Sequence, residues 1–231
     1  MLWLSRLLLV LLCWLVTTPA WAAVADEGHN LAIANSVSVT CAGSNRALYV
    51  FVSVDSGVDQ ALTVTFNTSE SVGQLIESNV GQYMGLFRLL NPTATTANVA
   101  VTGTGLTVAI AAVCVSGVDG TTPEETPQQE VTGGATSLSG ITNTGYASGD
   151  LILTACAANN QTSPTFTVTG NTEIAEVGDG TMGLVYASGT STTPSCSWGS
   201  STRASHIEVV VNQVAAGGTV NFFPRRLQVN P

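Results

Sequence analysis

The chain has 231 residues and a net charge of −9, and only 9% of its residues are charged although 45% are hydrophobic. Only six residues are basic, all of them arginine, against fifteen acidic residues, so a basic nucleic-acid-binding surface is not expected and no nucleic acid is expected among the partners. The content of valine, isoleucine, leucine and phenylalanine is too high for an acidic disordered chain, and we expect a weakly charged globular domain.

The first 22 residues have the organisation of a signal peptide. One positive residue, Arg6, precedes an apolar run at 7–16, and residues 20–22 (AWA) fit an A-x-A cleavage site. The apolar run is shorter than the roughly 20 residues that a membrane-spanning helix needs. We therefore predict a signal peptide at 1–22 and a secreted protein, extracellular or periplasmic, with no stable membrane insertion after cleavage. An uncleaved anchor is the alternative.

After the leader, apolar and polar residues alternate almost throughout, and no long stretch repeats at helical spacing. At 205–212, Ile207 and Val209 share one face while His206 and Glu208 share the other, which is typical of a half-buried strand. Runs of this kind occur at 46–55, 62–66, 83–90, 98–102, 106–116, 151–157, 165–169, 174–177, 183–187 and 205–212.

Turn residues separate the predicted strands. Residues 170–171 (Gly-Asn) and 217–218 (Gly-Gly) suit two-residue turns with positive φ, so we expect a hairpin at both places. The polar interval at 117–149 is expected to be a surface excursion with one strand inside it. Pro224 follows two phenylalanines, so the last strand should end there or lie at a sheet edge.

About ten to twelve short strands, with turn signals roughly every ten residues, predict an all-β fold. We expect a lead-in and first strand at 23–40. A single antiparallel β-sandwich, or jelly roll, is expected at 41–231, preceded by the cleaved signal peptide. One domain of this length can bury a proper core.

Removal of the leader leaves four cysteines, Cys41, Cys114, Cys156 and Cys196. An even number in an exported chain favours two disulfides. We predict that Cys41 pairs with Cys196 and Cys114 with Cys156, on the premise that the outer pair joins the first and the late strands. Four buried free thiols are the alternative, and no pair has the spacing of a zinc site.

Catalytic patterns in the sequence are sparse. His206 is the one credible general base, but no Gly-x-Ser-x-Gly motif accompanies it, and we expect an outward-facing strand residue. Glu173 and Glu176 have some likeness to the paired acids of jelly-roll glycosidases, yet residues at i and i+3 of a regular strand face opposite ways. Both glutamates are therefore expected on a solvated surface.

Metal and cofactor patterns are equally weak. Asp55, Asp59 and Asp119 lie in turn-like segments and are weak candidates for calcium ligands. None belongs to a twelve-residue calcium-binding loop, so turn aspartates are the preferred interpretation, and a structural calcium stays open as the alternative. A chain without lysine cannot form a Walker-type phosphate-binding loop, and no other pattern in the sequence implies an organic cofactor, so none is expected.

Two distinctive segments, 116–123 (SGVDGTTP) and later 148–151 (SGDL), stand among several others in a characteristic order. With these two as the most specific match, the order of the segments resembles a widespread, functionally uncharacterised group of exported or surface-exposed β-sandwich domains in bacterial and phage-type sequences. The resemblance implies a lectin-like jelly-roll sandwich and identifies no catalytic residues. The matching segments are 43–52, 62–66, 86–92, 99–102, 115–123, 147–151, 197–198 and 207–211.

Together these features predict a non-catalytic, secreted or surface-exposed interaction module. Its partner is expected to be a glycan or a cell-surface protein, with Trp198, Tyr146 and Tyr186 as the candidate ligand-binding aromatics. Core burial is the alternative for Trp198. Self-association, as a structural subunit of an extracellular or phage-related assembly, is the alternative function. A secreted glycoside hydrolase ranks lowest.

Overall fold

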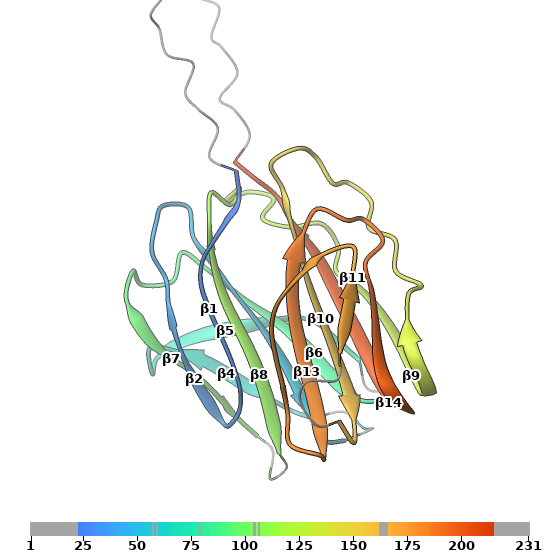
Figure 1. The fold of residues 1–231 in the computed structure, drawn as a ribbon. Helices are drawn as coiled ribbons and strands as arrows, with labels where there is room; N and C mark the ends of the chain where they lie inside the picture. Colours follow the sequence, from blue (N-terminus) through green and yellow to red (C-terminus); the bar gives the residue numbers. More distant parts are fainter. Residues whose placement is uncertain are drawn as a thin grey trace, which may run out of the picture.

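A computed structural model describes residues 23–56, 58, 60–78, 80–103, 105, 107–161 and 166–214. The predicted leader, the hairpin at 217–218 and the strand before Pro224 lie outside these residues. Within them, every regular element is a strand, and every strand pair is antiparallel (Figure 1). The all-β prediction is confirmed.

The strands in chain order are β1 (Ala25–Ile33), β2 (Ser36–Thr40), β3 (Ala47–Val54), β4 (Thr63–Phe66), β5 (Glu70–Ser78), β6 (Tyr83–Leu90), β7 (Thr96–Thr102), β8 (Val108–Ser116), β9 (Gln128–Leu138), β10 (Leu151–Asn159), β11 (Thr167–Thr169), β12 (Thr172–Gly178), β13 (Met182–Gly189) and β14 (Ser195–Val211).

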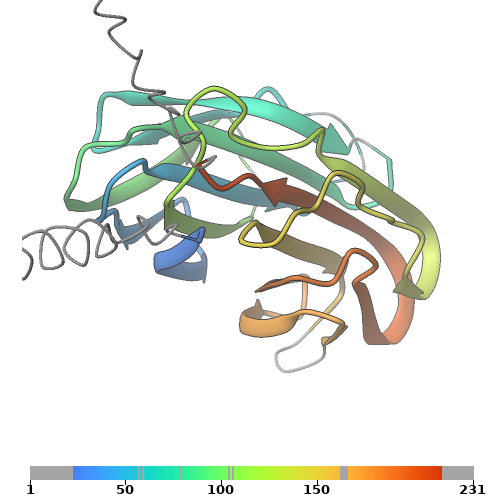
Figure 2. The ribbon, with the colours of Figure 1, turned by 90° about the horizontal axis from the view of Figure 1, so that it is seen from above.

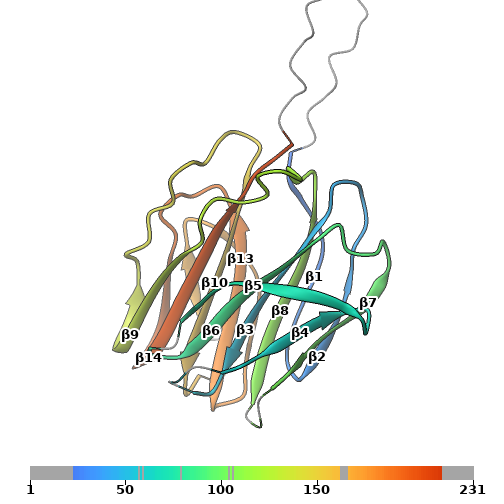
Figure 3. The same ribbon diagram turned by 180° about the vertical axis from the view of Figure 1, so that it is seen from behind.

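The larger sheet has eight strands in the order β1-β8-β3-β6-β5-β4-β7-β2. Its two edge strands, β1 and β2, are consecutive in the chain and lie close together. The Asn30 side chain of β1 donates a hydrogen bond to the Ser38 carbonyl of β2 at 2.9 Å. The sheet therefore curls until its edges nearly meet. Figure 3 shows this curl from behind, with β4 and β5 crossing in front of β3 and β8 and β7 at the side of the molecule.

The smaller sheet has the order β11-β14-β10-β13-β12, with β9 added to β14. Strand β14 is long enough to pair with different strands along its two halves. Its first residues pair with β11 and the end of β9, and its last residues pair with β10 and the start of β9. The pairing with β9 is irregular between Ser197 and Ala204, where β14 changes direction. Figure 2, seen from above, shows the smaller sheet beside the larger one.

Strand alternation divides the buried residues into three cores. One fills the curled sheet and includes Val50, Phe66 and Phe87. The second joins the two sheets, with Phe51 of β3 facing residues such as Ile207 of β14. The third covers the outer face of the smaller sheet. Because both faces of β3, β8, β10 and the end of β14 are covered, these strands are buried along nearly their whole length.

Each of the ten predicted strand runs contains a strand, and the interval at 117–149 contains one strand, β9, as expected. The predicted hairpin at 170–171 is wrong. Gly170 does have a positive φ of 94°, but the flanking strands β11 and β12 lie at opposite ends of the smaller sheet. The Asn171 side chain explains the turn, because it donates to Thr154 and accepts from the Ser191 amide.

Two disulfides are present, but the predicted pairing is wrong. Cys41 bonds to Cys114 and Cys156 bonds to Cys196. The curled sheet places the residue after β2 beside β8, so the outer cysteines of the sequence are not neighbours in space. Two disulfides indicate an oxidising, non-cytoplasmic environment.

Candidate functional site

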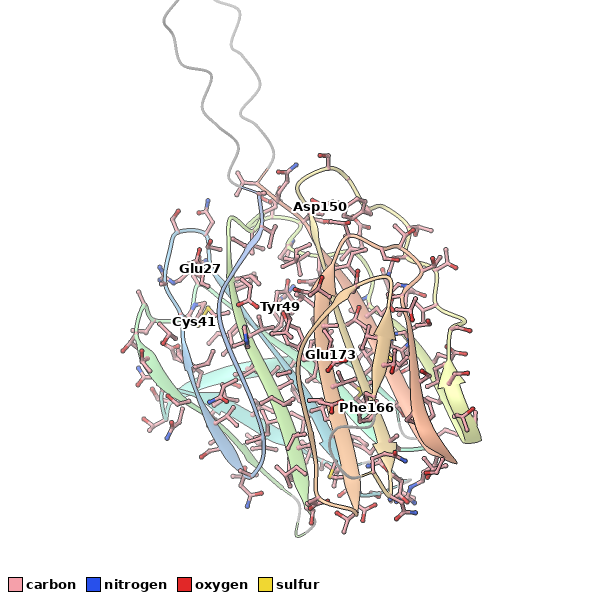
Figure 4. The ribbon with its side chains drawn as sticks, in the orientation of Figure 1. Glu27, Cys41, Tyr49, Asp150, Phe166 and Glu173 are labelled. Atoms are coloured by element: carbon pink, nitrogen blue, oxygen red, sulfur yellow. A yellow bond between two sulfur atoms is a disulfide. The ribbon has the colours of Figure 1, made fainter. Side chains whose placement is uncertain are left out.

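One end of the molecule carries an open pocket of about 300 Å³, which we call the loop pocket. The segment after β8, the segment before β10 and the residues directly after β14 form it; Figure 4 labels Asp150 at this end. Its lining is Asp119, Thr122, Glu125, Gly145, Ala147, Asp150, Asn212 and Gln213. Three carboxyl groups, one hydroxyl and two carboxamides therefore share one open space.

The two most specific segments of the sequence, 116–123 and 148–151, meet at the loop pocket. Asp119 belongs to the first segment, and its backbone amide donates to the Asn212 carbonyl at 2.9 Å. The Asn212 side chain donates in return to the Thr122 carbonyl at 2.9 Å. These contacts fix the segment after β8 against the chain that leaves β14.

The second segment forms the floor of the loop pocket. Asp150 is buried, and its carboxylate accepts from the amides of Ala147 at 2.7 Å and Gln213 at 2.9 Å. Gly149 has a φ of 103°, a backbone conformation that other residues rarely adopt, and a Cβ atom there would meet the Gln213 side chain. A glycine is therefore favoured at 149. The Asp150 carboxylate joins the segment before β10 to the residues after β14.

Two consecutive glutamates at the pocket turn in different directions. Glu124 turns inward, where it accepts from the Tyr49 hydroxyl at 2.8 Å and pairs with Arg88. Burial, followed by the nearby Glu124 carboxylate, raises the pKa of Tyr49 well above its ordinary value. Glu125 faces the loop pocket, and its carboxylate accepts from the Asn212 side chain at 3.2 Å.

The three aromatics predicted to bind a ligand do not lie together. Tyr146 is half-buried and stands between two residues of the pocket lining, Gly145 and Ala147. Trp198 is 5% exposed and belongs to the core on the outer face of the smaller sheet. Tyr186 is 2% exposed and belongs to the core between the sheets. Tyr146 is thus next to the loop pocket in the chain without belonging to its lining, and the other two lie in separate cores.

The calcium candidates have separate surroundings. Asp55 lies 2.8 Å from the Arg203 guanidinium and also accepts from the Asn159 side chain, so its charge is already compensated. Asp59 lies outside the described residues. Asp119 accepts from the amides of Thr121 and Thr122, which is the behaviour of a turn aspartate.

Comparison with protein-family models, curated proteins and solved structures finds no match for this chain. Among the residues that the structure describes, no helix is long and apolar enough to cross a membrane. The function of the candidate sites is therefore inferred from the positions and contacts of their own residues.

A second polar group is buried on the outer face of the smaller sheet. His206 and Glu208 face away from the core between the sheets, as the alternation predicts, but both are 0% exposed. The expectation of an outward-facing, half-buried strand is thus wrong, because residues of the 139–150 segment cover this face. The Asn143 side chain donates to Glu208, and the Gly140 amide donates to Glu130 at 2.6 Å.

Burial raises the pKa of the Glu208 carboxyl above its ordinary value of 4.5. His206 and Asn143 oppose this shift by favouring the ionised form. The Nε2 atom of His206 lies 2.7 Å from the nearer Glu208 oxygen, although the two are not aligned as a hydrogen bond. Within the described part of the chain, neither ring nitrogen of His206 has a hydrogen-bond partner.

Glu173 and Glu176 share one face of β12, contrary to expectation. The pairing of β12 with β13 shifts between Glu173 and Ala175, so Glu173 lies opposite Ala187 and Glu176 opposite Val185. The extra residue of a bulge places two residues that are three positions apart on the same side of the strand. Slight burial, followed by repulsion from Glu176, raises the pKa of Glu173. Glu173 is exposed, and Glu176 accepts from the Phe166 amide at 3.1 Å.

Sequence reasoning missed the residues that build the loop pocket and the buried polar group. Asp119, singled out as a turn aspartate, and the segments 116–123 and 148–151 were the parts of the pocket that the sequence marked. No signal in the sequence marks Asn143 and Gly140 as the partners of Glu208 and Glu130, because the 139–150 segment has no regular secondary structure.

Proposed function

We propose that this protein is an exported, non-catalytic β-domain of the lectin-like jelly-roll type that binds a neutral carbohydrate at the loop pocket. The observation that carries the proposal is the convergence of Thr122, Glu125, Asn212 and Gln213 on one open space. Hydroxyl, carboxylate and carboxamide groups together supply the donors and acceptors that match a sugar's hydroxyls.

The size and position of the loop pocket support a small polar ligand. A volume of about 300 Å³ is at the lower end of small-molecule sites and suits a single sugar ring. Among the described residues, the pocket lining contains no aromatic side chain, so recognition there would rest on hydrogen bonds to the sugar hydroxyls. Loops held by a rigid sheet scaffold are the usual place for such recognition.

A non-catalytic role is favoured by the surroundings of the titratable groups. In the described residues His206 is buried without a hydrogen-bond partner, so no serine or threonine hydroxyl is activated by it. The paired Glu173 and Glu176 lie on an edge strand, with Glu173 exposed to solvent. Glycoside hydrolysis would need a cleft that positions a sugar between two such acids.

The proposal is tested on a glycan array, followed by calorimetric titration of the best ligand. We expect at least one neutral glycan to bind. Thr122→Val and Glu125→Gln each remove hydrogen-bonding capacity from the pocket, and we expect each to weaken binding by about 10-fold, the effect of losing roughly 1–1.5 kcal/mol.

Thr107→Val is the matched control. Thr107 lines a separate open pocket of about 340 Å³, together with Ile33, Ala34 and Asn35 at the turn between β1 and β2. This variant should bind the glycan as the unchanged protein does. An array without any bound glycan, or binding that survives the Thr122→Val and Glu125→Gln changes combined, would overturn the proposal.

A further inference from the structure

Two cysteines and a histidine come together on the outer face of the smaller sheet. The sulfur atoms of Cys156 and Cys196 and a ring nitrogen of His206 all lie within 4.8 Å of one another. Cys156 on β10 and His206 on β14 are direct cross-strand partners. Cys196 lies earlier on β14, before the irregular stretch. Two separate parts of this one strand, at Cys196 and at His206, therefore lie beside Cys156.

The imidazole at this cluster lacks the hydrogen bonds that a buried polar group needs. His206 is 0% exposed, and among the described residues neither of its ring nitrogens has a hydrogen-bond partner. Buried polar atoms are nearly always satisfied; Nε2 faces the Glu208 carboxylate at 2.7 Å, and the ring keeps a nitrogen available for a ligand beside the two sulfurs. Sulfur and imidazole nitrogen are the donors that zinc prefers.

We propose that Cys156, Cys196 and His206 form a zinc site when the two cysteines are thiols, so that a zinc–thiolate centre and a disulfide are alternative states of one cluster. Two thiolates and one imidazole supply three protein ligands and leave one tetrahedral position for a further ligand. Glu208, whose nearer oxygen lies 2.7 Å from His206 Nε2, is placed to orient the ring.

The exchange between the two states is balanced with a dithiol reductant. Two electrons and two protons from the dithiol break the bond between the Cys156 and Cys196 sulfurs, and the reductant leaves as a cyclic disulfide. Binding of Zn²⁺ then releases the two thiol protons. Both cysteines are at most 1% exposed, so reduction is performed on the unfolded chain, which is then refolded.

The other cysteine pair provides an internal contrast. Cys41 and Cys114 lie inside the curled sheet among valine, leucine and phenylalanine side chains. Within the described residues, no third histidine, cysteine or carboxylate completes a comparable group with them. Zinc affinity should therefore depend on which pair is reduced.

The test uses the Cys41→Ala/Cys114→Ala variant, reduced and refolded, with Zn²⁺ measured against a chromogenic chelator and Co²⁺ as a spectroscopic probe. We expect one metal ion per chain and a thiolate-to-cobalt charge-transfer band. The same variant with its remaining disulfide intact should bind neither ion, and nor should the reduced Cys156→Ala/Cys196→Ala variant.

Two further variants separate the metal site from a general effect on folding. His206→Asn should abolish tight binding, and Glu208→Gln should weaken it by about 10- to 100-fold while keeping the charge-transfer band. The inference fails if the reduced Cys41→Ala/Cys114→Ala variant has native circular dichroism but no cobalt–thiolate band. Glycan binding at the loop pocket is measured in parallel and is independent of this result.

Discussion

Glu208 is buried in a place where its charge is only partly compensated. The raised pKa means that the folded state holds the proton of this carboxyl more tightly than the unfolded chain, which titrates near 4.5. From about pH 4.5 up to the raised pKa, the unfolded chain loses its proton first. The free energy of unfolding contributed by this group therefore falls as the pH rises through that window.

Glu208→Gln should remove this dependence. We expect the free energy of unfolding of the variant to be flatter with pH than that of the unchanged protein, and its stability above the window to be equal or greater. Urea unfolding between about pH 4 and pH 8 measures it. Glu27→Gln, at an exposed residue, is the control and should leave the slope unchanged. Parallel curves for Glu208→Gln and the unchanged protein would contradict the assignment.

Side-chain direction was partly predictable at this scale. Alternation along β14 correctly separates His206 and Glu208 from Ile207 and Val209. It cannot reveal burial, because exposure of the second face depends on whether a distant segment covers it. Residues 139–150 do so here through the side chain of Asn143, a contact between positions far apart in the chain.

Among the elements, the two disulfides close loops of different length. The sequence separations are 73 for Cys41–Cys114 and 40 for Cys156–Cys196. Because loop-closure entropy grows only with the logarithm of length, the two should contribute almost equally, with a difference of about 0.5 kcal/mol. Replacing either pair by alanine is expected to cost about 2–5 kcal/mol.

Urea unfolding of the two double-alanine variants checks this prediction. Each variant is compared with the unchanged protein under oxidising conditions, and the unchanged protein with both bonds reduced is the reference for their combined loss. A variant that loses less than about 1 kcal/mol would mean that its bond adds little beyond the surrounding core.

Strands that are straight and buried were the easiest to predict, and strands that change partners were the hardest. Strand β5 was missed because it pairs with β4 over its first residues and with β6 over the rest, with a shift between Gln74 and Ile76. Its apolar residues therefore do not keep one face. The bulge in β12 misled the prediction for Glu173 and Glu176 for the same reason.

At the scale of the whole molecule, the negative charge constrains the ligand. The chain carries −9, and three carboxyl residues line the loop pocket. Sialylated or sulfated glycans should therefore bind more weakly than their neutral counterparts, and the difference should shrink as salt screens the repulsion. Titrations of a matched neutral and anionic pair at low and high ionic strength measure this, and equal affinities at low salt would contradict it.

The pairing of early segments with late ones sets the order in which parts of the fold can form. Strand β1 is made first, yet it pairs with β8, and the Val24 amide bonds to the Gly149 carbonyl. Val118, directly after β8, bridges to Gln213 at the far end of the described chain. Early segments must therefore wait for late ones, and such non-local pairing folds slowly. The larger sheet can therefore close only after β8 is made, and its contacts with Gly149 and Gln213 form later still.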